Sequence, residues 1–167
     1  MYFVRTAGEQ DLQKVRSLLV ETWQAAYDRH YGVAKVTELI DTLLTPAKLK
    51  ARLQKRDSEF LVADNGEDIG GMGYAVMSEN MSKTVLLHML YVRPQLQRNG
   101  IGRDLFAELE TCFPDAEVMR LDVEPENAEA IAFYENHGFV EVGRNENAGQ
   151  GQSGIPALVF EKRLGGH

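Results

Sequence analysis

The segment Val92-Arg-Pro-Gln-Leu-Gln-Arg-Asn-Gly-Ile-Gly102, followed directly by Arg-Asp-Leu-Phe-Ala-Glu-Leu-Glu110, decides how this chain is organised. The apolar run from Val85 to Val92 predicts a strand, and this strand ends at a proline. A short polar loop with two glycines follows and opens a helix. The sequence therefore predicts a strand–loop–helix unit here.

The chemistry of this loop favours an anionic ligand. Gly100 and Gly102 have no Cβ, so a bulky anion can come close to the backbone there. Free N–H groups at a helix start, together with the positive end of the helix macrodipole, favour a pyrophosphate. Arg98 and Arg103 add cationic donors on either side. We expect the turn to bind a phosphorylated carrier.

Two familiar glycine loops do not match. A dinucleotide-binding fingerprint needs a third glycine at the position that Leu105 occupies here. It also has a tight turn directly after the strand, whereas this chain has the longer segment Pro94–Asn99 before its glycines. A Walker A loop needs Gly-Lys-Ser/Thr, which this sequence does not contain. The remaining pattern, Gln97-x-x-Gly100-x-Gly102 between a strand and a helix, resembles motif A of the GNAT superfamily of acyl-CoA-dependent N-acetyltransferases.

A second segment strengthens this resemblance. Leu121-Asp-Val-Glu-Pro-Glu-Asn-Ala-Glu-Ala-Ile-Ala-Phe-Tyr-Glu-Asn-His-Gly-Phe139 is similar to motif B, in which a strand leads to an Asn and then to a helix. Both motifs stand in the family's order and together span about Val85 to Val142. Within the superfamily, two segments most resemble the spermidine/polyamine acetyltransferase-like branch: the Thr22-Trp23 to Tyr27 stretch and the Phe133-Tyr134-Glu135 run.

Composition predicts one soluble domain over residues 1–167. The chain is 44% hydrophobic and 26% charged, and no apolar stretch approaches the roughly 20 residues that a membrane span needs. No signal-peptide pattern is seen, which favours a cytoplasmic protein without membrane attachment. The single cysteine, Cys112, excludes an intrachain disulfide and a cysteine-based metal cluster, so we expect no metal.

The net charge of the chain indicates which classes of binding partner to expect. The net charge of −7 argues against nucleic acid, since such sites usually lie on a basic face. It is compatible with a cationic acceptor such as a polyamine, although acidic proteins of this kind are common. Many members of the superfamily are dimers, which leaves a homodimer open, and nothing in the composition indicates its interface.

The hydropathy pattern predicts helices early and a hairpin next. Tyr2–Arg5 reads as a strand, and Glu9–Asp11 begins a long helix. Its apolar stripe is expected to contain Leu12, Val15, Leu19, Trp23 and Ala26. Thr45-Pro46 starts a shorter helix. Strands at 59–64 and 69–78 around Asn65-Gly66 predict an antiparallel hairpin, in which Gly70, Gly71 and Gly73 indicate a bulge or close backbone approach.

The rest of the chain alternates strands and helices. Thr84–Val92 and Val118–Glu124 are predicted strands, Asn127–His137 a helix closed by Gly138, and 139–144 and 157–162 the last strands. The fold class is therefore α/β, with a mixed, partly antiparallel central sheet of about seven strands and helices on both faces. The GNAT resemblance implies the same fold.

The resemblance also implies which residues hold acetyl-CoA. The pyrophosphate is assigned to the loop and helix start, which comprise Gln97, Arg98, Asn99, Gly100, Ile101, Gly102 and Arg103. By motif position, Leu90, Tyr91 and Val92 pair with the pantetheine arm, and one of their N–H groups contacts the acetyl oxygen. Asn127 serves as helix N-cap and as a polar contact to the same arm. Asp104 is expected to point to solvent, because a carboxylate repels a pyrophosphate.

Acetyl transfer to an amine needs a base and an acid. An alkylammonium has a pKa of about 10.4, so a base must deprotonate it. His88 is the first candidate, on the same face of the strand as Leu90, although a lone His in a strand is often structural. Glu124 is the rival, followed by Glu79. Tyr134 occupies the family's position for the acid that protonates the leaving thiolate; the alternative is that Phe133-Tyr134 only packs the helix onto the sheet.

The acceptor site is expected along the first helix and the loop between the last two strands. Trp23, Tyr27 and Tyr31 can form an aromatic wall that attracts an ammonium group, although Trp23 also fits the core. Glu124 is counted with Trp23 and Tyr27 as acceptor-binding. The loop is Asn145–Ile155. These features predict an N-acetyltransferase with a small cationic primary amine as acceptor; the alternatives are peptide or protein acetylation, at an N-terminus or a lysine, and a non-catalytic acyl-CoA sensor.

Overall fold

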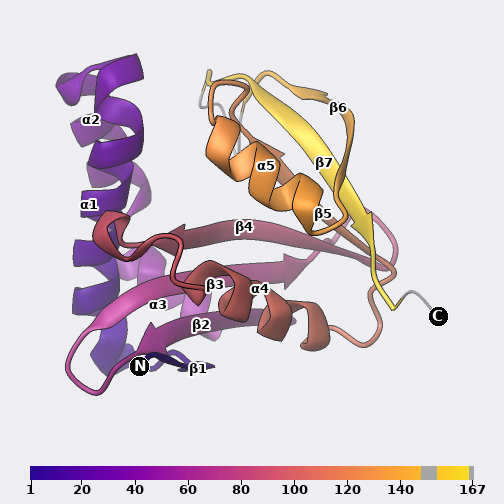
Figure 1. Ribbon diagram of the computed structural model, residues 1–167, viewed down its shortest axis with the longest axis horizontal. Coiled ribbons are helices and arrows are strands. Elements are labelled where there is room, and N and C mark those ends of the chain that lie inside the picture. The colour runs from indigo at the N-terminus through magenta and orange to yellow at the C-terminus, as the bar shows by residue number, and fades with distance from the viewer. Residues whose placement is uncertain (148–153, 166–167) are drawn as a thin grey trace. The chain divides into compact units, whose positions relative to one another are not determined.

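The computed structural model describes residues 1–147 and 154–165, and it forms two compact units. The first unit contains Met1–Ala75 and Met89–Cys112, and the second contains Val76–His88 and Phe113–His167. The strands form a seven-stranded mixed sheet in the order β1-β2-β3-β4-β5-β7-β6, which confirms the predicted fold class (Figure 1).

The first unit carries most of the helices. In chain order its elements are β1 (Phe3–Thr6), the 3₁₀ turn η1 (Glu9–Asp11), α1 (Leu12–Tyr31), α2 (Val33–Leu43), α3 (Pro46–Gln54), β2 (Ser58–Asp64), β3 (Ile69–Met77), the end of β4 (Thr84–Val92), the 3₁₀ turn η2 (Pro94–Leu96) and α4 (Ile101–Thr111). The predicted start of α3 is confirmed, because the Thr45 side chain accepts a hydrogen bond from the Lys48 N–H at 3.2 Å.

The second unit is built on antiparallel pairing around its last strand. Its remaining elements are β5 (Val118–Val123), α5 (Ala128–Asn136), β6 (Val140–Asn145) and β7 (Ala157–Arg163). Strand β7 pairs antiparallel with both β5 and β6, and the β6 register shifts between Glu141 and Gly143. The start of β4 pairs parallel with β5 over Thr84–Leu86.

Strand β3 carries helices on both of its faces. A Cβ built on Gly71 would lie 2.9 Å from the Ile101 side chain, and one on Gly73 would lie 2.8 Å from Leu109, so α4 packs directly on these glycines. The predicted close approach at these positions is thereby confirmed. Tyr74 points to the opposite face, where the Arg52 guanidinium of α3 lies 5.9 Å from its ring centre.

Burial along α1 differs from the predicted stripe. The buried residues are Val15, Leu18, Leu19, Thr22 and Trp23, whereas Ala26 is exposed. Placing Ala26 on the buried stripe was wrong: beyond Trp23 it is the Tyr27 side chain that is partly covered, and its ring contacts Trp23. Thr22 can be buried because its hydroxyl donates to the Leu18 carbonyl.

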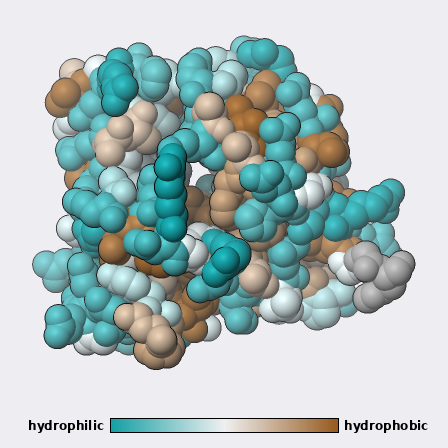
Figure 2. Space-filling view, viewed as in Figure 1, coloured by the Kyte–Doolittle hydropathy of each residue, from teal (hydrophilic) through white to brown (hydrophobic). Residues whose placement is uncertain are grey.

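Polar side chains cover much of the surface. The face seen in Figure 2 is largely hydrophilic, with separate apolar patches between the charged groups. Among the described residues, no helix is long and apolar enough to cross a membrane.

Candidate active site

The glycine loop of the first unit presents backbone N–H groups at the start of α4. Gly100 is the N-cap and has φ of 84°, a conformation that favours glycine. The first helical bond of α4 runs from the Asp104 N–H to the Gly100 carbonyl at 3.0 Å. The N–H groups of Ile101, Gly102 and Arg103 therefore precede the helical ladder, as an anion site requires.

The Arg103 side chain lies against the loop, because a Cβ built on Gly100 would be 2.8 Å from its Nη2. Arg103 and Asp104 are 70% and 57% exposed and form an ion pair, with 3.6 Å between Nε and Oδ1. The Asp104 side chain is thus exposed to solvent as expected, and it also contacts Arg103. Arg98 has φ of 69°, which is uncommon outside glycine and is found often at functional turns. Ile101 is buried, so only its backbone N–H is available to a ligand. The Gln97 side chain turns back and donates to the Val92 carbonyl at 3.4 Å.

The end of β4 is held by an arginine that sequence reasoning missed. The Arg93 N–H donates to the Gly70 carbonyl at 2.8 Å, and its guanidinium donates to the Ile69 carbonyl at 3.1 Å and pairs with Glu21 of α1. This arrangement ties Leu90, Tyr91 and Val92 to α1 and β3. The only signal in the sequence is a cation before Pro94, and its partner Glu21 lies 72 positions away.

The aromatic residues of α1 form a ladder that reaches β4. The Trp23 ring lies 6.1 Å from Tyr27 and 6.4 Å from Tyr91, and Tyr27 lies 6.0 Å from Tyr31. Trp23 is 9% exposed, as its assignment to the core predicts, and Tyr27 is half-buried. The first unit thus brings Trp23 and Tyr27 together with Tyr91.

In the second unit, helix α5 carries the predicted acid and N-cap. The Asn127 side chain accepts a hydrogen bond from the Ala130 N–H at 3.1 Å, which confirms its capping role. The Tyr134 ring makes edge contacts with Phe133 and Phe139, both at 5.4 Å. Tyr134 therefore takes part in packing the helix, and this packing also fixes the direction of its ring.

The candidate bases also belong to the second unit. His88 is half-buried in β4, and its side chain points to the opposite face of the strand from the buried Leu87 and Met89. Glu124 directly follows β5, and its carbonyl accepts a hydrogen bond from the Asn127 N–H at 3.0 Å. Glu79 is exposed after β3.

The predicted acceptor loop is described only at its two ends. Asn145 donates to the Asp122 carboxylate at 3.0 Å, and the Gly154 N–H donates to the Asn147 side chain at 2.8 Å. Positions 148–153 of the loop lie outside the described residues. Within the described part of the chain, no group of three or more His, Cys, Asp or Glu could hold a metal ion.

A known domain family and several known proteins are similar to this chain. The model of the acetyltransferase (GNAT) domain matches residues 27–163. A thialysine N-ε-acetyltransferase of Caenorhabditis elegans is 30% identical over 106 residues, which cover 61% of this chain and 66% of the relative, just under two thirds of its length.

Solved structures share the fold at low identity. The PaiA N-acetyltransferase from Thermoplasma acidophilum, in complex with coenzyme A, has a TM-score of 0.83 at 20% identity and covers 98% of this chain and 99% of its own. A spermidine N-acetyltransferase chimera from Vibrio cholerae has a TM-score of 0.68 at 19% identity, with 97% and 95% covered.

Proposed function

Because the chain belongs to the acetyltransferase (GNAT) domain family, we propose that it transfers an acetyl group from acetyl-CoA to a primary amine by direct attack. The observation that carries this proposal is the start of α4, where Gly100 has a positive φ and three N–H groups precede the helical ladder. This arrangement suits the pyrophosphate of coenzyme A.

The residues that would hold acetyl-CoA fit its chemistry. The loop Gln97–Arg103 supplies backbone donors, and the exposed Arg103 can add a charged contact to a phosphate. The backbone of Leu90–Val92, held by Arg93, would pair with the pantetheine arm. One N–H at the acetyl oxygen would stabilise the charge that develops there, a contribution on the order of 3 kcal/mol.

Two side chains of this chain would move the protons. His88 would take the proton from the acceptor's ammonium group so that the neutral amine can attack, a task that suits an imidazole because a free imidazole has a pKa near 6.5; Glu124 is the alternative base. Tyr134 would donate its phenolic proton to the leaving thiolate, whose conjugate thiol has a pKa of about 8.5. Acetyl-CoA itself supplies the activated thioester carbonyl.

The proposed acceptor is a small cationic molecule with a primary amine. Two relatives support this class by their names, since one acts on thialysine, an amino acid with a side-chain amine, and the other on spermidine, a polyamine. The aromatic ladder of Trp23, Tyr27 and Tyr31 offers ring faces of the kind that attract an ammonium group.

The first test measures release of the coenzyme A thiol from acetyl-CoA with polyamines, amino acids, aminoglycosides and short peptides. We expect turnover with small amines and a loss of kcat of about a hundredfold or more in Tyr134→Phe, because the thiolate then leaves unprotonated. Tyr2→Phe, at a tyrosine outside the proposed site, is the matched control.

The outcomes separate the alternatives. Turnover that survives Tyr134→Phe would remove Tyr134 as the acid while leaving the acetyltransferase in place. Bound acetyl-CoA without turnover of any small amine would favour a protein acceptor, or a sensor of acyl-CoA.

A further inference from the structure

Three buried hydrogen-bond donors in the first unit have no partner in the described part of the chain. One is Nε of Arg93, whose two Nη atoms are paired. The other two are Nε1 of Trp23 on α1 and Nη1 of Arg52 on α3. Buried donors are almost always paired, because each loses its hydration without compensation. A guanidinium is the more costly of the two, since it also carries charge.

Trp23 and Arg52 both interact with Tyr91, at the end of β4. The Trp23 and Tyr91 rings are 6.4 Å apart, and Arg52 lies close enough to Tyr91 to interact with it electrostatically. Leu90–Val92 is the segment proposed to pair with the acyl arm. The two donors are therefore on residues next to the part of the first unit where an acceptor would meet the acetyl group.

Among residues 1–147 and 154–165, the groups that interact with the Arg52 charge are aromatic, and no carboxylate forms an ion pair with it. Its guanidinium lies 5.9 Å from the centre of the Tyr74 ring. Burial lowers the pKa of Arg52, and the groups that oppose this shift are the two tyrosines, Tyr74 and Tyr91. A buried cation without a carboxylate is stabilised when a ligand supplies one.

An anion bound by Arg52 would not be the pyrophosphate of coenzyme A. Gly71 and Gly73 of β3 face α4 and its glycine loop, whereas Tyr74 and Arg52 lie on the opposite face of the same strand. A ligand group that meets Arg52 is therefore separated from the start of α4 by the sheet.

We propose that Arg52 and Trp23 form an anion subsite for the acceptor, so that the preferred substrate is an amino acid carrying both a primary amine and a carboxylate. This inference rests on the proposed acetyl transfer. Arg52 would pair with the carboxylate, and the Trp23 indole N–H would donate to one of its oxygens. The carboxylate would thereby position the amine of the acceptor.

Lysine and 1,5-diaminopentane give the sharpest test, because they differ only by the carboxylate. We expect the wild-type protein to prefer lysine in kcat/KM. In Arg52→Gln the kcat/KM for lysine divided by that for diaminopentane should fall about 10- to 100-fold, mainly because the KM of lysine rises. This is the size of effect expected when a hydrogen bond between charged groups is lost. Trp23→Phe keeps an aromatic ring but loses the N–H donor, and it should lower this ratio less.

Arg56→Gln, at an exposed arginine just beyond α3, is the matched control and should leave the ratio unchanged. If Arg52 had a purely structural role, Arg52→Gln would lower kcat/KM for lysine and for diaminopentane by the same factor, and that result would overturn the subsite. A rise in the KM of acetyl-CoA alone in Arg52→Gln would also overturn it, by assigning the anion to the carrier.

Calorimetric binding of lysine keeps the subsite testable if neither amine is acetylated, an outcome that would itself count against the proposed function. Lysine binding that is lost in Arg52→Gln and kept in Arg56→Gln would support the subsite. Equal binding to both variants, or no binding to the wild-type protein, would contradict it.

Discussion

At the scale of single residues, Gly71 controls how closely α4 approaches β3. A Cβ at this position would lie 2.9 Å from Ile101 Cγ2, 3.0 Å from Leu105 Cδ1 and 3.1 Å from the Tyr91 carbonyl oxygen. One of these neighbours is backbone, so the site cannot relax by a side-chain rotation alone. The absence of one side chain thus brings the start of α4 next to the end of β4.

Gly71→Ala should therefore destabilise the protein by about 1–3 kcal/mol, as overpacking of a core does. It should also raise the KM of acetyl-CoA, because Ile101 and Tyr91 both belong to the proposed carrier site. Urea unfolding and steady-state kinetics check the two effects. Gly143→Ala is the control, because no atom lies within 4 Å of its new Cβ on β6, and it should change neither the stability nor the KM of acetyl-CoA. Equal stability of Gly71→Ala and Gly143→Ala would contradict the packing argument.

At the scale of elements, local patterns were sufficient for most helix starts and strand ends. Thr45 and Asn127 cap α3 and α5 as predicted, because a cap depends only on residues two or three positions away. The exposure of Ala26 could not be predicted, since it depends on what covers the last turns of α1. The break between α1 and α2 occurs at Gly32, whose φ is 83°.

Helix α5 gives a prediction that separates capping from ligand binding at Asn127. Asn127→Ala should lower the free energy of unfolding by about 1 kcal/mol, because the Ala130 N–H loses its acceptor. Asn127→Asp keeps a capping oxygen and should restore stability, but it removes the amide donor proposed to contact the pantetheine arm. Asn127→Asp should then raise the KM of acetyl-CoA. An unchanged KM would show that Asn127 acts only as the N-cap of α5.

At the scale of the whole molecule, the functional residues that the sequence did not reveal are those with distant partners. Arg93 pairs with Glu21 across 72 positions, and Arg52 meets Tyr74 and Tyr91 from a helix that is separate in sequence. Glycine loops and caps have local signatures, whereas such pairs arise only when the chain has folded. Motifs therefore located the proposed carrier site, while the proposed acceptor subsite required the structure.

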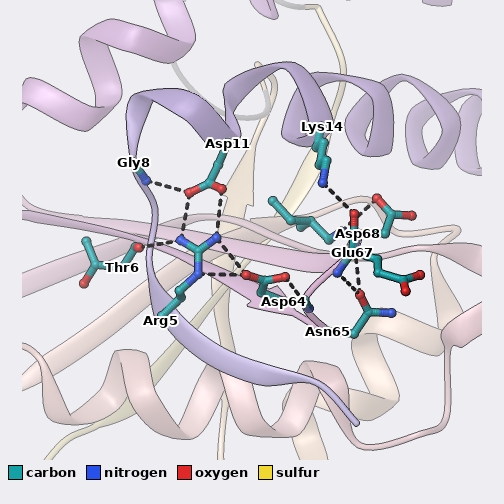
Figure 3. Close-up of polar contacts among 11 residues, drawn as sticks. Arg5, Thr6, Gly8, Asp11, Lys14, Asp64, Asn65, Glu67 and Asp68 are labelled. Carbon is teal, nitrogen blue, oxygen red and sulfur yellow. Dashed lines mark hydrogen bonds and ion pairs between the residues drawn. The ribbon is translucent and has the colours of Figure 1, made fainter.

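The same long-range pairing stabilises the N-terminal segment of the first unit. Figure 3 shows the Arg5 guanidinium of β1 between Asp11, at the end of η1, and Asp64, at the end of β2. Both Arg5 Nη atoms donate to Asp11 at 2.8 Å, Nε donates to Asp64 at 3.0 Å, and the Gly8 N–H also donates to Asp11. Asp11 is buried, so its charge depends on these contacts.

Because of these contacts, the stability of the folded protein should fall as the pH is lowered into the acid range. The hydrogen bonds from Arg5 hold the pKa of Asp11 below its ordinary value. A carboxyl with a lowered pKa in the folded state contributes stability that is fully present well above its unfolded pKa of about 3.9 and is lost as the pH falls through the folded value. Asp11→Asn should therefore cost about 1–3 kcal/mol at pH 7, with a smaller difference from wild type below about pH 3. Thermal unfolding between pH 2.5 and 7 measures this convergence, and a constant difference across that range would show that Asp11 acts through packing rather than through its charge.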